Sequence, residues 1–429
     1  MKSRVWQSEC NPILHAAFAA RRDALVSATP GSGKTWLALN FAGELRQSGQ
    51  INHIHVAAPT LLITNGWRDV AAGLGITLVS DGNNHLGATD DIVATYAQIG
   101  KSPEIHAAII SASRSLAIND EIHHASDDMN WGQSLETALE HARFRLHMSG
   151  TPFRQDQHRI PFIEYGADGM SRADYVYGYT RAIAEGVCRP VDFHCYDAAI
   201  RLRGTTGDDE IARVMRLTLM PKAGVVEKMV SDADADLSER RIHSSDAAGM
   251  VVAMTQAHAR DCARIVAEVT GVVPPVIISD SETAEHDLAQ FRTGTARWVV
   301  AVKMLSEGVD VPRLTTAVYA TNIVTTLFFR QLVGRVVRVR SSNPDETASV
   351  YMPRDDRLIR EAADIEGEIG AALALAPERY SGLRRKLAAG TALITNAPVP
   401  RRADPIDAAG YSVSQTGFRY KETFRPSYR

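Results

Sequence analysis

The sequence predicts an α/β protein with two tandem parallel sheets, each flanked by helices, and a short C-terminal extension. Short apolar runs alternate with helix-forming segments along most of the chain. That order is typical of parallel strands joined by crossover helices. A glycine-rich turn at residues 28–35 also stands between an apolar run, residues 24–27, and a helix-forming segment, residues 36–45. Strand, glycine-rich turn and helix in this order are the context that a phosphate-binding loop requires.

The composition is that of a globular protein. A chain of 429 residues is long enough for two domains of ordinary size. Its 45% hydrophobic and 23% charged residues predict a soluble chain. The net charge of −3 argues against a wholly basic coat protein for nucleic acid and still allows a local basic groove. No apolar stretch is long enough to span a bilayer, and residues 1–6 lack the apolar core of a signal peptide.

The cysteines form no C-x-x-C pair, so neither a zinc ribbon nor an iron–sulfur cluster is indicated. Scattered thiols suit a reducing compartment, and we expect a cytoplasmic protein without a membrane partner. The four thiols belong to Cys10, Cys188, Cys195 and Cys262.

The glycine-rich turn is the first candidate site. Gly31, Ser32 and Gly33 allow backbone N–H groups to close around a polyphosphate, with a helix N-terminus behind them. Lys34 is placed to reach the outer phosphates, and the Thr35 hydroxyl is placed to bind Mg²⁺. Ala28 stands where the strict pattern has glycine, but the later Gly-Lys-Thr outweighs that departure.

Gln7 lies just upstream of this turn. Its side-chain amide offers both a donor and an acceptor, which match the amidine edge of adenine. We therefore expect Gln7 to contact adenine, with Trp6 stacking nearby, although a lone glutamine is also a common surface residue.

Two adjacent acids follow the apolar run at residues 116–118. The run predicts a strand, which places Asp120 and Glu121 at the carboxyl edge of a parallel sheet, where ligands bind. Asp120 is the candidate Mg²⁺ ligand, and Glu121 is the candidate base that orients and deprotonates an attacking water. Asn119 is unusual in a strand that is otherwise apolar.

Three further runs predict strands that end in small polar residues. Residues 53–58 end at Pro59 and Thr60, where a helix begins, and residues 92–96 include Thr95. Strand ends followed by helix N-termini favour anions, here the phosphates of nucleic acid. Residues 144–152 end with Ser149 and Thr151, whose hydroxyls can hydrogen-bond the acidic pair. Trp67, in the helix after Thr60, is expected in the core rather than against a base.

The second half repeats the strand–helix alternation. Expected strands at residues 189–196, 249–256, 276–279, 298–302 and 316–320 predict a second parallel sheet. Gly308 permits a close approach of the backbone, and Asp310 can bond a ribose hydroxyl.

Gln331, Arg335 and Arg338 are spaced to share one face of a helix. Two guanidinium groups on one helix face can bind the γ-phosphate of a nucleotide that is held by the facing domain.

The expected domain limits are residues 1–155 for the first domain, 156–188 for a linker, 189–365 for the second domain and 366–429 for the extension. The extension interleaves basic and aromatic residues from residue 377 onward. Such a pattern can hold single-stranded nucleic acid by charge and stacking, or it can be a partly disordered tail or a strap over the second sheet.

In order, these stretches resemble the motif set of superfamily 2 DExH-box helicases and translocases. Within that group they resemble the helicase subunits of type III restriction enzymes and the phage or phage-exclusion DEAD/DEAH helicases. The matching positions run from Gln7 to Arg338 and include residues 31–35, the Asp-Glu-Ile-His box at 120–123, and residues 331–338.

The resemblance implies two RecA-like domains that bind ATP and Mg²⁺ between them. It assigns catalytic roles to Lys34, Glu121, Arg335 and Arg338. It implies coupling through His123, Ser149, Thr151 and Gln331, and backbone contacts to nucleic acid from Pro59, Thr60, Thr95 and Thr255.

The function expected from this resemblance is an ATP-driven helicase or translocase that acts on DNA without sequence preference. A nuclease or methyltransferase partner is a further implication of the resemblance. The tail carries no nuclease signature of acidic residues with a following lysine, so a complete restriction enzyme is not implied. Two alternatives stay open: an ATP-gated nucleic-acid clamp without strand separation, and an RNA helicase.

Overall fold

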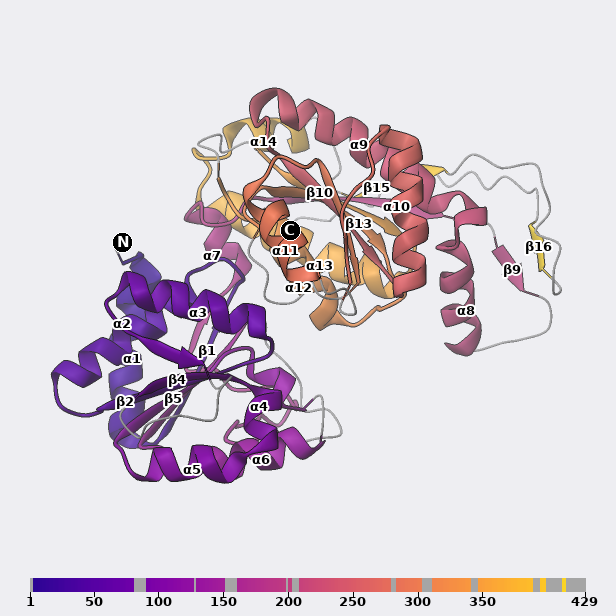
Figure 1. Cartoon of the computed structure of the whole chain (residues 1–429). Coiled ribbons are helices and arrows are strands. Elements are labelled where there is room, and N and C mark those ends of the chain that lie inside the picture. Colours follow the sequence, from indigo (N-terminus) through magenta and orange to yellow (C-terminus); the bar gives the residue numbers. More distant parts are fainter. Residues whose placement is uncertain are drawn as a thin grey trace.

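The computed structural model describes residues 3–80, 90–126, 129–150, 160–197, 200–202, 208–278, 283–302, 311–340, 346–388, 394–398 and 411–413. Two lobes lie side by side in Figure 1, the first indigo to purple and the second magenta to yellow. Each lobe is built on its own parallel sheet, as the sequence predicts.

The first sheet has seven strands in the order β3-β4-β2-β5-β6-β1-β7, and every neighbouring pair is parallel. Parallel strands end at one edge, so the turns that follow β1, β2, β4, β5 and β6 lie next to one another. Their bounds are β1 Asp23–Ala28, β2 His53–Ala58, β3 Leu78–Ser80, β4 Asp91–Thr95, β5 Ser115–Asn119, β6 Phe144–Ser149 and β7 Tyr175–Tyr177.

Helices cover both faces of this sheet. In β1, Ala24 and Val26 belong to the apolar core on one face, while Leu25 belongs to the core on the other. This alternation follows from the two-residue period of a strand. The first face carries α1 Val5–Ala20, α2 Lys34–Gln47 and α3 Leu61–Gly73, and the second carries α4 Tyr96–Lys101, α5 Pro103–Ser111 and α6 Met129–Leu139.

The second sheet is also parallel, in the order β11-β12-β10-β13-β14-β8-β15. Its strands are β8 Val191–Asp197, β10 Ala248–Ala253, β11 Val276–Ile277, β12 Trp298–Val302, β13 Leu314–Ala320, β14 Ala348–Pro353 and β15 Ile394–Pro398. Helices α9 Val225–His243, α10 Gln256–Thr270, α11 Ala284–Thr293 and α12 Thr326–Val336 pack on it, and α13 Asp356–Leu375 packs on α12 and on α7 Tyr179–Ala184.

The remaining elements are short. Strands β9 and β16 pair antiparallel beside the second lobe, near α8 (Figure 1). The bounds are α8 Asp208–Thr218, α14 Ser381–Ala388, β9 Ile200–Leu202, β16 Tyr411–Val413, and the 3₁₀ turns Ile122–Ser126 and Pro221–Ala223.

The sheets extend past the expected domain limits. Strand β7 lies within residues 156–188, which were expected as a linker, yet it pairs with β1 in the first sheet. Helix α13 runs across residue 365, and β15 places part of the C-terminal extension on the edge of the second sheet. Residues 399–410 and 414–429, most of the basic and aromatic tail, lie outside the described residues.

A hydrogen-bonded chain explains the polar Asn119 in β5. The Asn119 side-chain amide donates to Nδ1 of His147 in β6 at 3.0 Å. Nε2–H of His147 is then the donor to Asp23 in β1, at 3.3 Å. The amide nitrogen of Asn119 and both ring nitrogens of His147 therefore have partners, which offsets much of the cost of burying them.

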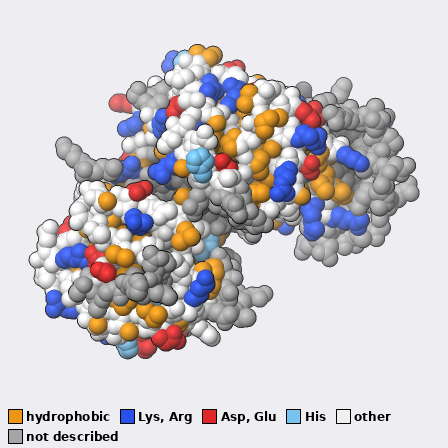
Figure 2. All heavy atoms as spheres, in the orientation of Figure 1, with side chains coloured by type: hydrophobic (Ala, Val, Ile, Leu, Met, Phe, Trp, Pro, Cys, Tyr) orange, Lys and Arg blue, Asp and Glu red, His pale blue; other side chains and the backbone are white. Residues whose placement is uncertain are grey.

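The charges on one face of the molecule are dispersed. Figure 2 shows lysine and arginine side chains over both lobes with acidic and hydrophobic ones between them. None of the helices in the described ranges has both the length and the apolar character needed to cross a bilayer.

Candidate functional site

The glycine-rich turn has the backbone of an anion cradle. Gly31 has φ +79° and Gly33 φ +93°, in the left-handed region where a side chain would be strained. Gly33 is the N-cap of α2, which begins at Lys34. The first N–H groups of a helix have no acceptor within the helix, so those of α2 can serve a phosphate.

Helix α1 holds this turn from behind. Arg4 Nη1 donates to the carbonyls of Ser32 at 2.7 Å and Gly31 at 3.1 Å, and the Trp6 indole N–H donates to Ser32 O at 3.2 Å. Trp6 is fully buried and stacks on Tyr177, with ring centroids 4.8 Å apart, so the expectation that it stacks near a base is wrong.

Gln7 takes part in the same support. Its Nε2 donates to the carbonyl of Gly33 at 3.0 Å, and its Oε1 accepts from the N–H of Arg4 at 2.8 Å. Both ends of the amide therefore bond to backbone groups here, and contact with adenine stays a prediction.

Lys34 and Glu121 form an ion pair, with Nζ 2.7 Å from Oε1. The N–H of Gly150 donates to the other oxygen of Glu121 at 2.8 Å. Glu121 has φ +47°, a conformation that costs energy in a non-glycine residue and is held by these contacts. Burial acts to raise the pKa of Glu121, but the charge of Lys34 outweighs it and holds that pKa below its ordinary value. Glu121 is therefore ionised and able to accept a proton.

Asp120 is held by two aromatic side chains. The indole N–H of Trp67 donates to Oδ2 at 2.9 Å, and the hydroxyl of Tyr96 donates to the backbone carbonyl at 2.9 Å. Burial raises the pKa of Asp120, and the charge of Glu121 raises it further.

His123 joins the two lobes. The Gln331 amide donates to Nε2 of His123 at 3.1 Å, so Nδ1 of the ring carries the proton. Nδ1 lies 3.2 Å from the hydroxyl of Ser149. Ser149 thus contacts the histidine, and the Gly150 N–H donates to Glu121; a contact of Ser149 with the acidic pair stays a prediction. Thr151, the other expected coupling residue, lies outside the described residues.

A cavity of about 410 Å³ lies between the lobes at this point. Groups from both lobes line it. The first lobe contributes Gly31, Gly33, Lys34, Thr35, Trp67, Asp120 and Glu121, and the second contributes Arg292, Arg335 and Arg338.

Arg335 and Arg338 both line this cavity, but they do not share one helix face as their spacing predicts. Arg335 is in the last turn of α12, but the helix ends at Val336, so Arg338 does not share its face. Arg338 instead pairs through its backbone with Cys188 of the segment between the lobes, and the Arg189 N–H donates to Val337 O at 2.7 Å. The Arg338 side chain reaches Gly31: a Cβ added there would lie 3.0 Å from its Cγ. Burial lowers the pKa of Arg338 to about 10.

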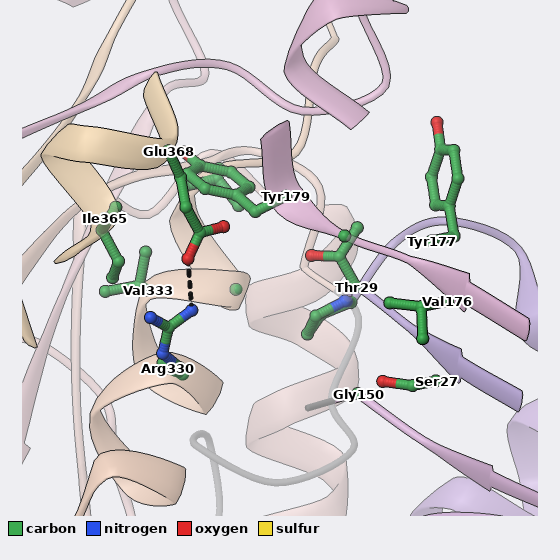
Figure 3. Close-up of a pocket in the computed structure, with 14 residues that line it drawn as sticks. Ser27, Thr29, Gly150, Val176, Tyr177, Tyr179, Arg330, Val333, Ile365 and Glu368 are labelled. Carbon is green, nitrogen blue, oxygen red and sulfur yellow. Dashed lines mark hydrogen bonds and ion pairs between the residues drawn. The ribbon is translucent and has the colours of Figure 1, made fainter. Parts of the chain in front are cut away.

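Helix α12 touches the glycine-rich turn directly. A Cβ added at Gly334 would lie 2.5 Å from Cγ of Pro30. A second cavity, of about 160 Å³, lies beside this contact. In Figure 3, Arg330 on α12 points to Glu368 on α13, and Ser27, Thr29 and Val176 of the first lobe lie across from them.

We expect Gly334→Ala to push the lobes apart, because the proline ring is rigid and cannot yield to the new methyl group. A displacement of about 1 Å at a reacting centre can cost ~10²-fold in rate, so turnover should fall by that order. The control is Gly367→Ala in α13, where an added Cβ meets nothing within 4 Å. Small-angle scattering and steady-state turnover check this, and wild-type values in both would contradict it.

Three threonines expected to meet nucleic acid are helix N-caps. The hydroxyls of Thr60, Thr95 and Thr255 accept from N–H groups in the first turns of α3, α4 and α10. Pro59 precedes Thr60 in the same turn, after β2. Gly308 and Asp310 lie outside the described residues.

Sequence reasoning missed Arg4 and Arg292 and took Trp67 only as a core residue. Trp67 is indeed buried, at 1% exposed, but it also bonds Asp120. No local pattern marks these residues, because each contact joins segments far apart in the chain. The position of Trp67, seven residues after Thr60, does not by itself predict its contact with Asp120.

Comparison with known proteins gives the family context. Residues 1–154 match the model of the type III restriction enzyme res subunit. The chain resembles superfamily 2 helicases. Uncharacterised protein Rv2917 of Mycobacterium tuberculosis is 39% identical over 365 residues, which are 80% of this chain and 60% of that protein. The chain thus spans about 60% of the length of this relative.

Solved structures share the fold. An HsdR fragment of a type I restriction enzyme from Vibrio vulnificus matches 92% of this chain and 68% of its own, with TM-score 0.60 and 17% identity. The type ISP enzyme LlaBIII bound to DNA matches 94% of this chain and 32% of its own, with TM-score 0.59 and 14% identity. Dbp5 of S. cerevisiae, bound to RNA and ADP BeF3, matches 93% of this chain and 90% of its own, with TM-score 0.57 and 12% identity. These likenesses confirm the predicted tandem RecA-like domains.

Proposed function

We propose that this chain is a nucleic-acid-dependent ATPase, a helicase or translocase that couples ATP hydrolysis between its lobes to movement along DNA. One observation carries the proposal: the cavity at the glycine-rich turn is lined by Lys34 and Glu121 from one lobe and by Arg335 and Arg338 from the other. A site completed by both lobes links nucleotide chemistry to their relative motion.

The first lobe would bind the nucleotide. Lys34 and the first N–H groups of α2 would contact the phosphates. Gln7 is proposed to contact adenine, and Gly308 and Asp310 are proposed to contact the ribose. Thr35 and Asp120 line the same cavity and offer a hydroxyl and a carboxylate, a donor set that suits Mg²⁺ alongside phosphate oxygens. A magnesium ion bound there neutralises charge on the phosphates.

Glu121 would act as the general base. Lys34, which pairs with Glu121 here, is also the side chain that reaches the phosphates. When Lys34 turns to them, Glu121 is freed to accept a proton from water, while the Gly150 N–H keeps it oriented. Arg335 and Arg338 stabilise the charge of phosphoryl transfer from the second lobe.

Nucleic acid would cross the sheet edges that carry Pro59, Thr60, Thr95 and Thr255. Contacts of this type go to the sugar–phosphate backbone and carry little sequence information. His123, Ser149 and Gln331, with Thr151, would report the state of the nucleotide to this surface. DNA is favoured because the family model and two of the structural neighbours are restriction enzymes. A nuclease or methyltransferase partner and a cytoplasmic location are part of the same proposal.

ATP turnover measured with single-stranded, duplex and forked DNA and with RNA tests the proposal. We expect DNA to raise turnover and RNA to leave it unchanged. Stimulation by RNA alone would make the chain an RNA helicase. DNA binding that depends on ATP, without turnover or movement, would make it a clamp, and absence of ATP turnover under all conditions would contradict a motor.

A further inference from the structure

We propose that Trp67 and Tyr96 are positioning residues for Asp120 and that they set the affinity of the cleft for a divalent cation. This rests on the proposed function, because the cation is the one expected with ATP. Neither residue belongs to the groups that sequence reasoning assigned to the cleft.

Trp67 fixes the carboxylate. Its indole N–H lies 2.9 Å from Oδ2 of Asp120, and both side chains line the cavity between the lobes. The indole ring is 1% exposed and is packed in the apolar core on the first face of the sheet. A ring held on all sides presents its N–H in one direction, so the carboxylate plane is fixed with it.

Tyr96 fixes the backbone of the same residue from the other face. Its hydroxyl donates to the carbonyl of Asp120 at 2.9 Å, and its ring belongs to the opposite apolar core. The N–H of Asp120 donates to Ala57 O at 2.8 Å. Asp120 is thus held at N, O and Oδ2, and its carboxylate lines the cavity, where a cation or its bound water can reach it.

The chemistry of the groups that donate to Asp120 supports a role in binding a metal ion. A buried carboxylate needs hydrogen bonds to offset the loss of water. A lysine or arginine would supply them but would also neutralise the charge that attracts a cation. Indole N–H is a neutral donor without acceptor capacity, so it orients the oxygen and leaves the negative charge to the metal. Partners of this kind commonly change metal affinity by about 10–100-fold when removed.

The chain provides a matched control. Trp298 donates its indole N–H to Oδ1 of Asp234 at 2.7 Å in the second lobe. Trp67→Phe and Trp298→Phe each remove one indole–carboxylate hydrogen bond and keep an aromatic ring. Both substitutions would lower the stability of the fold, whereas only Trp67→Phe is expected to change the affinity for the metal ion.

The experiment is a titration of the full chain with Mn²⁺ in the presence of ADP, followed by electron paramagnetic resonance, with thermal unfolding measured in parallel. We expect the Mn²⁺ Kd to rise about 10–100-fold in Trp67→Phe and to stay at the wild-type value in Trp298→Phe. Tyr96→Phe, which removes only a hydroxyl, should raise the Kd in the same direction and carries the test if Trp67→Phe does not fold.

A wild-type Kd in both Trp67→Phe and Tyr96→Phe would overturn this inference alone. Failure of the wild-type chain to bind Mn²⁺ with ADP would overturn the proposed function and this inference together. The two failures are therefore distinguishable in a single set of titrations.

Discussion

Glu121→Gln should lower ATP turnover by ~10²–10⁴-fold, the range that a positioned general base contributes. Glutamine keeps the size of the side chain and can still accept from the Gly150 N–H, but it cannot take a proton from water. It also releases Lys34 from the ion pair seen at 2.7 Å, which leaves the lysine free for phosphate. Nucleotide should bind at least as tightly, and the complex with nucleic acid should persist.

Steady-state turnover and the rate of nucleic-acid dissociation in ATP measure these effects. Glu268→Gln is the control, because Glu268 lies on α10 with 59% of its side chain exposed, outside the lining of the cavity. The base assignment fails if Glu121→Gln turns over ATP at the wild-type rate.

Local sequence patterns predict the glycine-rich turn and the acidic pair. A strand, a turn with two glycines and a helix are consecutive in the chain, so their spacing alone places Lys34 and Thr35. The acidic pair follows β5 directly, and the position of that strand in the sheet brings it to Lys34. The patterns that predict the two features each lie within a window of about 11–18 residues, whereas the contact between Lys34 and Glu121 depends on the sheet.

The domain limits were harder to predict, because they depend on pairing between distant segments. Strand β7 has three residues and no flanking alternation, and only its pairing with β1 defines it. Strand β15 joins the second sheet through β8, some two hundred positions earlier in the chain. Edge strands of this length carry little hydrophobic signal of their own.

The end of α12, at the site, was hard to predict for the same reason: it depends on pairing between distant segments. Spacing places Arg338 on a helix face, but the chain leaves the helix after Val336 to pair with Cys188. Because of that pairing, the side chain of Arg338 lies against Gly31, which it would approach from another direction if α12 continued. The prediction that both arginines face the cleft therefore agrees with the cavity lining, while the geometry assumed for Arg338 does not.

Arg335→Gln should cause the largest loss, because an arginine that stabilises phosphoryl transfer contributes ~10³–10⁵-fold to the rate. Arg335 is 8% exposed, lines the cavity and lies one turn after Gln331, which bonds His123 across the lobes. Glutamine keeps a polar side chain but removes the charge. Turnover should therefore fall while the Gln331–His123 contact, and nucleotide binding by the first lobe, persist.

Arg330→Gln separates this effect from damage to α12. Arg330 lies on the same helix but pairs with Glu368 at 2.7 Å and with Glu361 at 3.4 Å, at the second cavity (Figure 3). Its loss should lower the thermal midpoint and leave turnover close to that of the wild type. If instead both variants lost turnover equally, the effect would reside in the helix and its packing. Because the arginine must cross from one lobe to phosphates held by the other, a selective loss in Arg335→Gln alone would tie ATP hydrolysis to closure of the cleft.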